Sequence, residues 1–312
     1  MWGLQELCWT WRSHCITYTR VEPGINGSSM RGAVLCVHGF GASRRHWRHN
    51  LQALAEDADV FAIDLLGFGN SSKPTSCLSD EGLTPGAVRY GFDLWAEQLR
   101  DFYQEVIGAN RKLQLIGNSI GGVVALNAAR LLEEAGSQPA QVILIDCAQR
   151  ELDLKRLEEQ PWLAQRTRPL LMAVVRQRWL IRSLFQLLAQ PSFVRGVLQQ
   201  AYPSGANVDA ELVDLLISPS REPGASESFR GFVNLFDDWL APQLLAQIHC
   251  PVRLLWGEAD PWEPVAEAER WAKQFGCIQE LTVLPGLGHC PHDESPEQAN
   301  PILRRWIKIG WN

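Results

Sequence analysis

The strongest chemical signal in the sequence is a serine flanked by glycines, in the segment Gly117–Gly122 (GNSIGG). The segment follows the apolar run Leu113–Ile116 and precedes a helix-like stretch, so Ser119 is expected on a sharp strand-to-helix turn. The glycines allow chains to approach closely where a Cβ would clash, and the helix directs its positive N-terminal end toward the turn. This context predicts that Ser119 is a nucleophile rather than part of an ordinary Gly/Ser turn.

A serine nucleophile needs a base to take its proton and an acid to orient that base. His289 lies in a loop after the apolar run Leu281–Leu284, where it can reach over a serine. Asp260 lies between Ser119 and His289 along the chain, just after the run Val252–Trp256. The order Ser, Asp, His is typical of one class of serine enzymes. The sequence therefore predicts His289 as the general base and Asp260 as its orienting acid.

The orienting acid has two alternatives. Glu258 stands shortly before Asp260, and Asp146 directly follows the apolar run Val142–Ile145. Asp260 also precedes a proline, and an Asp-Pro pair can simply close a strand with a turn. The chain order favours Asp260, and Asp146 is the fallback.

The loop His38–Gly41 (HGFG) follows the first buried apolar run and can supply one half of an oxyanion hole. The backbone N–H groups of Phe40 and Ile120 are the predicted donors. His38 itself is expected to pack under the loop rather than to carry a proton. Asp64, which ends a second apolar run, is expected to bond nearby backbone in a tight turn.

The segment His289–Asp293 (HCPHD) has the residue types of a metal site, but we expect no metal there. A zinc site would need a fourth ligand, and Pro291 stiffens the loop against wrapping around an ion. His292 and Asp293 are predicted to be structural partners within the loop. The chemistry predicted for Ser119 requires no metal and no organic cofactor.

Around these residues, short apolar runs alternate with longer amphipathic segments. The runs are typical of buried strands bounded by Gly, Asp or Pro: Ala33–Val37, Val60–Ile63, Leu113–Ile116, Val142–Ile145, Val252–Trp256 and Leu281–Leu284. Helix-like segments lie between them, as in Gly91–Val106, Gly121–Leu132 and Pro264–Phe275. This alternation predicts the α/β class, with a mostly parallel central sheet that helices cover on both faces.

The alternation stops after Ile145 and resumes at Val252. The residues between are helix-like or irregular, and several prolines interrupt them. We interpret this interruption as an inserted helical cap, or lid, of residues 149–242. The core is then made of residues 1–148 and 243–312.

Composition limits the partners of the chain. The net charge is −6 and 46% of the residues are hydrophobic, so the chain can bury a full core, and nucleic acid is not expected as a partner. No run is long and apolar enough for a membrane-spanning helix. The start, Met1–Trp11, lacks basic residues and contains Glu6, which argues against a signal peptide.

The eight cysteines are scattered, without a C-x-x-C pair. Cys36 and Cys147 lie in or just after apolar runs and are expected to be small buried hydrophobes. We therefore expect no disulfide framework and a reducing, soluble compartment such as the cytoplasm.

Residues 161–200 of the cap contain six arginines and no acidic residue, although the whole chain is acidic. Apolar residues recur between the arginines at helical spacing, so one face is apolar with basic borders. One interpretation is a cap helix packed on the core, with its arginines in solvent. The other is a basic amphipathic lid that touches an anionic membrane peripherally and binds a long apolar chain.

Taken together, these motifs resemble the α/β-hydrolase family over most of the chain outside the cap. Three stretches and the GNSIGG turn are similar to its pheophytinase and chlorophyll dephytylase group: HGFGASRRHW (His38–Trp47), DLLGFGNSSKP (Asp64–Pro74) and GHCPHDESPE (Gly288–Glu297). The resemblance implies a carboxylic ester hydrolase with a Ser-His-Asp triad and an oxyanion hole. Its substrate would be a hydrophobic small-molecule ester such as the phytyl ester of chlorophyll or pheophytin. It also implies chlorophyll catabolism next to a photosynthetic membrane.

Three other functions stay open. A C–C bond hydrolase would use the same triad on vinylogous diketones. An epoxide hydrolase or haloalkane dehalogenase needs an aspartate at the turn where this chain has Ser119. A non-catalytic ligand-binding receptor on the same fold would not need the complete Ser, Asp and His set.

Overall fold

A single sheet organises the computed structural model, which describes residues 4–22 and 32–311. Within these residues eight strands form the sheet in the order β1-β2-β4-β3-β5-β6-β7-β8. β1 and β2 run antiparallel to their neighbours, and all other pairs are parallel. The strands are β1 (Leu4–Trp11), β2 (His14–Val21), β3 (Ala33–Val37), β4 (Asp59–Ile63), β5 (Leu113–Asn118), β6 (Gln141–Ile145), β7 (Val252–Gly257) and β8 (Ile278–Leu284). The predicted α/β class with a mostly parallel sheet is confirmed.

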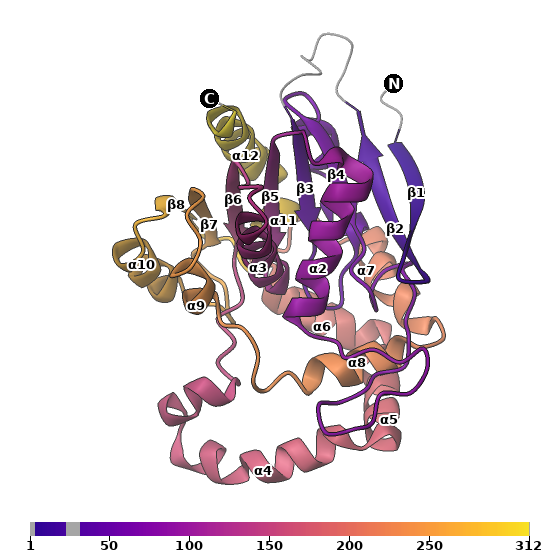
Figure 1. Ribbon diagram of the computed structural model, residues 1–312. Coiled ribbons are helices and arrows are strands. Elements are labelled where there is room, and N and C mark those ends of the chain that lie inside the picture. The colour runs from indigo at the N-terminus through magenta and orange to yellow at the C-terminus, as the bar shows by residue number, and fades with distance from the viewer. Residues whose placement is uncertain (1–3, 23–31, 312) are drawn as a thin grey trace.

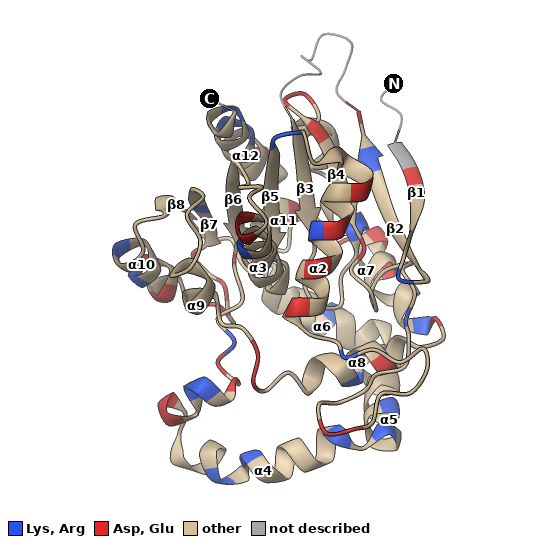
Figure 2. Cartoon of the chain, viewed as in Figure 1, with Lys and Arg blue, Asp and Glu red and all other residues tan. Residues whose placement is uncertain are grey.

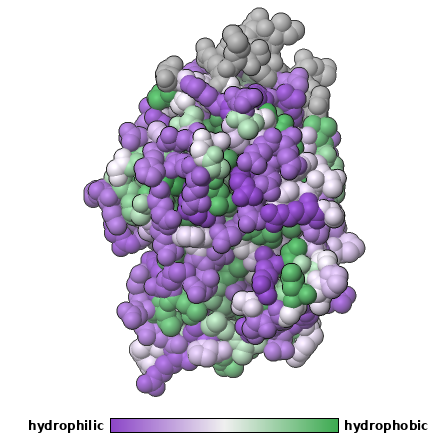
Figure 3. Space-filling model, in the orientation of Figure 1, coloured by the Kyte–Doolittle hydropathy of each residue, from purple (hydrophilic) through white to green (hydrophobic). Residues whose placement is uncertain are grey.

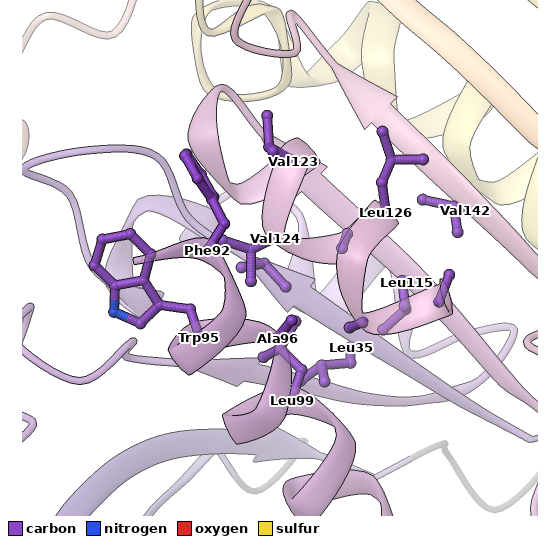
Figure 4. Packing of buried hydrophobic residues seen from close by; sticks show 14 of the residues in the cluster. Leu35, Phe92, Trp95, Ala96, Leu99, Leu115, Val123, Val124, Leu126 and Val142 are labelled. Atoms are coloured by element: carbon purple, nitrogen blue, oxygen red, sulfur yellow. The ribbon is translucent and has the colours of Figure 1, made fainter. Parts of the chain in front are cut away.

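Helices cover both faces of the sheet, as Figure 1 shows. One face packs against α2 (Phe92–Phe102), α3 (Ile120–Glu134) and α10 (Val265–Gln274), and the other against α1 (Leu51–Leu54) and α12 (Pro296–Gly310). In Figure 4 the apolar side chains of α2 and α3 meet those of the sheet. Every residue of β3, β4, β5 and β6 is buried, because a parallel strand covered on both sides has no solvent face.

Shorter elements complete the core. A π-helical turn, Tyr103–Gly108, continues α2, and a 3-10 turn, η1 (Arg44–Trp47), follows β3. α11 (Pro291–Glu294) precedes α12, and α9 (Ala241–Leu245) leads into β7. Within the described residues, no helix is both long and apolar enough to cross a membrane.

The N-terminal strands form a hairpin that the sequence analysis did not predict. Its two-residue turn, Arg12 and Ser13, has φ angles of 48° and 66°, the left-handed region that such hairpin turns require. Cys8 and Cys15 form a disulfide across the hairpin, with their Cα atoms 6.1 Å apart. We expected no disulfide framework, and this pair is a disulfide that the expectation missed, so the cysteines no longer support a reducing compartment.

The other cysteines behave differently. All six are free, and Cys36 and Cys147 are fully buried among apolar residues, as predicted. The segment predicted not to be a signal peptide, Met1–Trp11, is part of β1 from Leu4 onward. Its first three residues lie outside the described ranges.

Between β6 and β7 the chain leaves the sheet and forms only helices and loops. They lie at the lower end of the molecule in Figure 1, beyond the carboxyl ends of the parallel strands, and we call residues 149–242 the cap. The cap helices are η3 (Leu154–Glu159), α4 (Trp162–Arg176), α5 (Arg178–Leu188), α6 (Pro191–Ala201), α7 (Ala210–Ile217), η4 (Ser218–Arg221) and α8 (Ala225–Val233). The chain therefore closes over the sheet edge where parallel α/β folds place their ligands.

Candidate active site

Ser119 occupies a strained turn between β5 and α3. Its φ of 55° and ψ of −125° are unusual for a residue with a side chain, and such strain is concentrated at functional sites. The turn depends on its glycines. A Cβ on Gly121 would lie 2.5 Å from the carbonyl oxygen of His38, and one on Gly117 would collide with the backbone of Gly121. The predicted nucleophile turn is therefore present in the fold.

The backbone of Ser119 is fixed to the neighbouring strand. Its N–H donates to the carbonyl of Ile145 at 3.0 Å, and its own carbonyl accepts from the N–H groups of Gly122 at 3.0 Å and Ala148 at 3.1 Å. With 9% of its surface exposed, the residue is nearly enclosed. These bonds hold the hydroxyl at the carboxyl edge of the sheet, under the cap.

His289 and Asp260 are in direct contact. Nδ1 of His289 lies 2.7 Å from Oδ2 of Asp260, and Oδ1 of Asp260 accepts the N–H groups of Trp262 at 2.9 Å and Glu263 at 3.2 Å. The histidine is buried, and the ring of Trp262 packs edge-on against it at 4.9 Å. With Nδ1 engaged by the carboxylate, Nε2 is the nitrogen left to accept a proton.

Asn118 connects the histidine loop to the serine turn. Its side-chain amide donates to the carbonyl of His289 at 3.1 Å and to the carbonyl of Ile145 at 3.2 Å. The N–H of His289 in turn donates to the carbonyl of Ala201, in the cap, at 2.9 Å. Sequence reasoning missed Asn118, although it occupies the variable position just before Ser119. The one signal that could have found it is its residue type, because an asparagine next to a buried nucleophile is itself buried and its amide must be hydrogen-bonded.

The two alternative acids have other roles. Asp146 is fully buried and accepts the N–H of Gly257 at 2.9 Å. Burial and the neighbouring Asp260 raise the pKa of Asp146 well above its usual value, which favours its neutral form. Glu258 is exposed and accepts the N–H of Gly286 at 3.1 Å. Within the described ranges, neither bonds to His289.

Asp260 is kept ionised by its partners. Burial by itself would raise the pKa of Asp260, but the hydrogen bond from His289 and the adjacent imidazole outweigh burial and leave that pKa below its ordinary value. A charged carboxylate can hold the imidazole in one tautomer and stabilise the imidazolium. Of the three acids considered from sequence, Asp260 is the one in contact with the histidine.

The predicted oxyanion donors flank the serine. A Cβ on Gly39 would lie 3.1 Å from Cβ of Ser119, so the loop carrying Phe40 runs directly over the nucleophile. Among the described residues, the backbone N–H groups of Phe40 and Ile120 have no hydrogen-bond partner. The Phe40 ring stacks on Phe232 of the cap at 3.9 Å. Two free donors beside a buried serine can stabilise a negatively charged oxygen.

His38 and Asp64 support this loop. His38 is fully buried and accepts the N–H of Leu65 at Nε2, so its Nδ1 donates to the carbonyl of Gly39 at 2.8 Å. Burial lowers the pKa of His38, so the ring is neutral. Asp64 accepts the backbone N–H of Arg44 at 2.6 Å and of Asn70 at 2.8 Å. Both residues hold backbone in place, as the sequence predicted.

The segment after His289 packs into the protein. His292 is fully buried between the rings of Trp47, at 4.6 Å, and His46, at 5.0 Å. Asp293 accepts from the hydroxyl of Tyr202 and from Nε of Arg48, each at 3.0 Å. Within the part of the chain that the structure describes, no cluster of three or more His, Cys, Asp or Glu side chains could hold a metal ion.

One hollow lies between the core and the cap, and a second lies within the cap. The inner pocket, of about 60 Å³, borders Phe40 and is mainly apolar, with lining residues that include Phe68, Phe185, Leu216, Ala225 and Phe229. The outer groove, of about 1160 Å³, opens on the cap surface and is lined by residues that include Arg178, Trp179, Arg182, Phe185, Ser220 and Arg221. Phe185 and Ser220 line both, so these two residues separate the outer groove from the inner pocket.

Comparisons with known proteins agree with this architecture. Pheophytinase of Arabidopsis thaliana is 28% identical over 88% of this chain, which spans 61% of the length of that protein. An uncharacterized hydrolase of Bacillus subtilis, YugF, is 25% identical over 89% of this chain and 90% of its own length. The fold matches an esterase from Thermogutta terrifontis with a TM-score of 0.69 and 22% identity, over 99% of this chain and 100% of the esterase.

The family model described as "Alpha/beta hydrolase family" matches residues 34–301, which include the turn, the acid and the histidine. The match extends over both halves of the core and across the cap. The chain belongs to the α/β-hydrolase family.

Proposed function

We propose that this protein is a serine-dependent carboxylic ester hydrolase. The observation that carries the proposal is the buried contact of His289 with Asp260, at 2.7 Å, tied through Asn118 to the strained turn of Ser119. A serine, a histidine with a free Nε2 and an ionised acid are the three groups that acyl transfer to a hydroxyl requires. Two unpartnered N–H groups beside the serine supply the fourth requirement, an oxyanion hole.

In the proposed reaction, the hydroxyl oxygen of Ser119 attacks the ester carbonyl while Nε2 of His289 takes the hydroxyl proton. The N–H groups of Phe40 and Ile120 donate to the negatively charged oxygen of the tetrahedral intermediate. The imidazolium then gives its proton to the departing alcohol, and an acyl-enzyme remains on Ser119. Water, deprotonated by His289, attacks the acyl-enzyme and releases the carboxylic acid.

The substrate we propose is a hydrophobic ester. The inner pocket is lined mainly by aromatic and aliphatic side chains, which favour an apolar group on the side of the site where Phe40 lies. A volume of about 60 Å³ holds only a small part of a long chain, so a larger substrate requires that Phe185 move and join this pocket to the outer groove. A phytyl ester of a chlorophyll-type pigment is the specific candidate, supported by the similarity to pheophytinase.

The test uses purified protein with pheophytin, chlorophyll and a series of p-nitrophenyl esters of increasing chain length, and identifies the products by mass. Free phytol together with the pigment acid is the expected result, and the Ser119→Ala variant should release neither. Cleavage of the simple esters without release of phytol would reject the phytyl substrate and keep the esterase. Failure on every ester, with no attachment of a fluorophosphonate probe to Ser119, would overturn the proposed function and favour a binding protein.

A further inference from the structure

The outer surface of the cap is unusually apolar. Nine large hydrophobic side chains of α4, α5 and α6 are exposed: Trp162, Leu163, Leu170, Leu171, Val174, Trp179, Leu184, Leu187 and Phe193. Leu170, Trp179 and Leu187 each expose 68% of their surface. Figure 3 shows hydrophobic residues gathered at the lower end of the molecule, where Figure 1 has these helices. Concentrations of this kind mark sites of contact with a partner or a membrane.

On α4 the exposed apolar residues share one side of the helix. Leu163, Leu170 and Val174 follow each other at spacings of seven and four, which bring side chains to the same face. The opposite side already has its partners. Val175 is buried, and the guanidinium of the buried Arg168 lies 5.4 Å from the ring of Phe236. The helix thus packs on the cap with one face and presents a second apolar face to solvent.

The arginines of residues 161–200 fall into two groups. Arg168 is buried, Arg176 pairs with Asp80, and Arg178 pairs with Glu227, so these three are already neutralised or enclosed. The other three, Arg166, Arg182 and Arg195, are exposed and form no ion pair among the described residues. Figure 2 shows blue positions along α4 and α5 without a red one. The apolar surface therefore carries an excess of positive charge.

We propose that this cap face, formed by α4, α5 and the start of α6, docks on a membrane that contains anionic lipids. Exposed Trp and Leu side chains interleaved with arginine are the chemistry of an interfacial surface, because the rings and aliphatic groups enter the boundary region while guanidinium groups reach the phosphates. The Arg166 guanidinium already lies 5.4 Å from the ring of Trp162, so charge and apolar surface are adjacent.

Docking in this way would bring the outer groove close to the lipid, because Trp179 and Arg182 belong both to the cap face and to the groove wall. If the proposed ester hydrolysis holds, an apolar substrate dissolved in the bilayer could reach the inner pocket past Phe185 without crossing water. Binding to lipid itself needs no turnover, so it can be measured separately from the reaction.

The first experiment is flotation of the full chain with vesicles of phosphatidylcholine, alone or mixed with phosphatidylglycerol. We expect binding to the mixed vesicles that weakens as salt is added. Replacing all three unpaired arginines (Arg166→Gln, Arg182→Gln, Arg195→Gln) should weaken binding roughly fivefold per arginine and about a hundredfold in total. The matched control removes three positive charges elsewhere (Arg270→Gln, Lys273→Gln, Lys308→Gln) and should leave binding unchanged.

A second variant tests the apolar part of the surface. Leu170→Ala, Trp179→Ala and Leu187→Ala together should cost at least about another tenfold in binding, since they remove exposed apolar area that would enter the lipid. The melting temperature and the far-UV circular dichroism of every variant should match those of the parent protein, which shows that the fold is intact. Equal binding to both vesicle types, or no effect of the three arginines, would overturn the proposal. So would a concentration-dependent dimer in which the same variants break self-association.

Discussion

The core and the cap use apolar residues in opposite ways, and two helices of equal length make the difference plain. α3 and α4 each have 15 residues. In α3 eleven of them are buried, from Ile120 to Leu132, whereas in α4 only Arg168 and Val175 are. α3 is enclosed between the sheet and its neighbouring helices, and α4 has a partner on one side only.

This difference in burial suits the core and the cap to different roles. In the proposed reaction the core fixes the reacting groups, since Ser119 directly precedes α3 and its turn is bonded to β6. Catalysis of acyl transfer needs such preorganised donors and acceptors. The cap instead exposes apolar surface, which under the proposals above a ligand or a lipid would contact. Changes in the core should therefore affect every substrate, and changes in the cap should affect only large or membrane-bound ones.

The largest effect is expected for Ser119→Ala. Loss of the nucleophile should lower kcat on all esters by about 10⁴ to 10⁶, while the melting temperature stays close to that of the parent protein. The matched cap variant is Phe185→Ala, between the outer groove and the inner pocket. It should leave short esters unaffected and change kcat/KM only for long ones. Rates measured over a series of esters of increasing chain length check both variants. Near-normal turnover by Ser119→Ala would show that Ser119 is not the nucleophile.

The next effect concerns the two buried acids of the core. Asp260→Asn should lower kcat by about 10⁴, because the amide no longer holds His289 in the tautomer that accepts the serine proton. Asp146→Asn should cost far less, since Asp146 bonds to the N–H of Gly257 rather than to the histidine, and burial already favours its uncharged form. Matched kinetics on one short ester decide the ranking. The reverse order would make Asp146 the orienting acid, and addition of EDTA should change neither rate.

Substitutions in the core and in the cap should also differ in their effect on the free energy of unfolding. Trp95 of α2 is fully buried and donates from Nε1 to the carbonyl of Leu66 at 3.0 Å, whereas Trp179 of α5 is 68% exposed. Trp95→Ala should lower the free energy of unfolding by about 3–5 kcal/mol, and Trp179→Ala should change it by no more than about 0.5 kcal/mol. Urea unfolding measures both. A large loss from Trp179→Ala would mean that the cap face is packed after all.

The core was the part that sequence predicted best, and the reason is physical. Buried parallel strands must be continuous apolar runs, so each predicted run coincides with a strand to within a few residues. The serine turn is equally predictable from the sequence, because its geometry excludes a Cβ at Gly117 and Gly121 and so requires glycine there. The contact of His289 with Asp260 followed from chain order alone. In these places local pattern and tertiary structure require the same residues.

Elsewhere the decisive facts are tertiary. The hairpin of β1 and β2 lacks a glycine in its turn, which uses Arg12 and Ser13 instead, so the usual signal was missing. The partner of Cys8 became evident only once that hairpin brought Cys15 beside it. In residues 161–200 of the cap, six arginines look alike in sequence, yet Arg176 and Arg178 are paired with acids from distant segments. Contacts between segments that are distant along the chain produce no periodic pattern in the sequence, so they could not be predicted from it.

The last comparison concerns the place where core and cap join. Glu263 follows Asp260 in the core, and an oxygen of its carboxyl group accepts the N–H of Gln149, the first cap residue, at 2.7 Å. Burial, added to by the charge of Asp260, raises the pKa of Glu263 from 4.5 to about 8, although the Gln149 N–H acts in the opposite direction. Between these values the folded protein holds a proton that the unfolded chain has released. Stability from this group must therefore fall as pH rises across that window, and change no further above it.

Glu263→Gln should remove this dependence, because the amide keeps an oxygen for the Gln149 N–H and has no proton to lose. The variant should match the parent in free energy of unfolding near the lower end of the window. Its advantage should then grow by at most about 1.4 kcal/mol per pH unit toward the upper end. Urea unfolding at several pH values measures the difference, with Glu258→Gln, an exposed glutamate of the same loop, as the control. A difference that stays constant with pH, or that grows equally in the control, would mean that Glu263 is ionised at the junction. The hydrogen bond from the Gln149 N–H would then be made to a charged carboxylate rather than to a neutral acid.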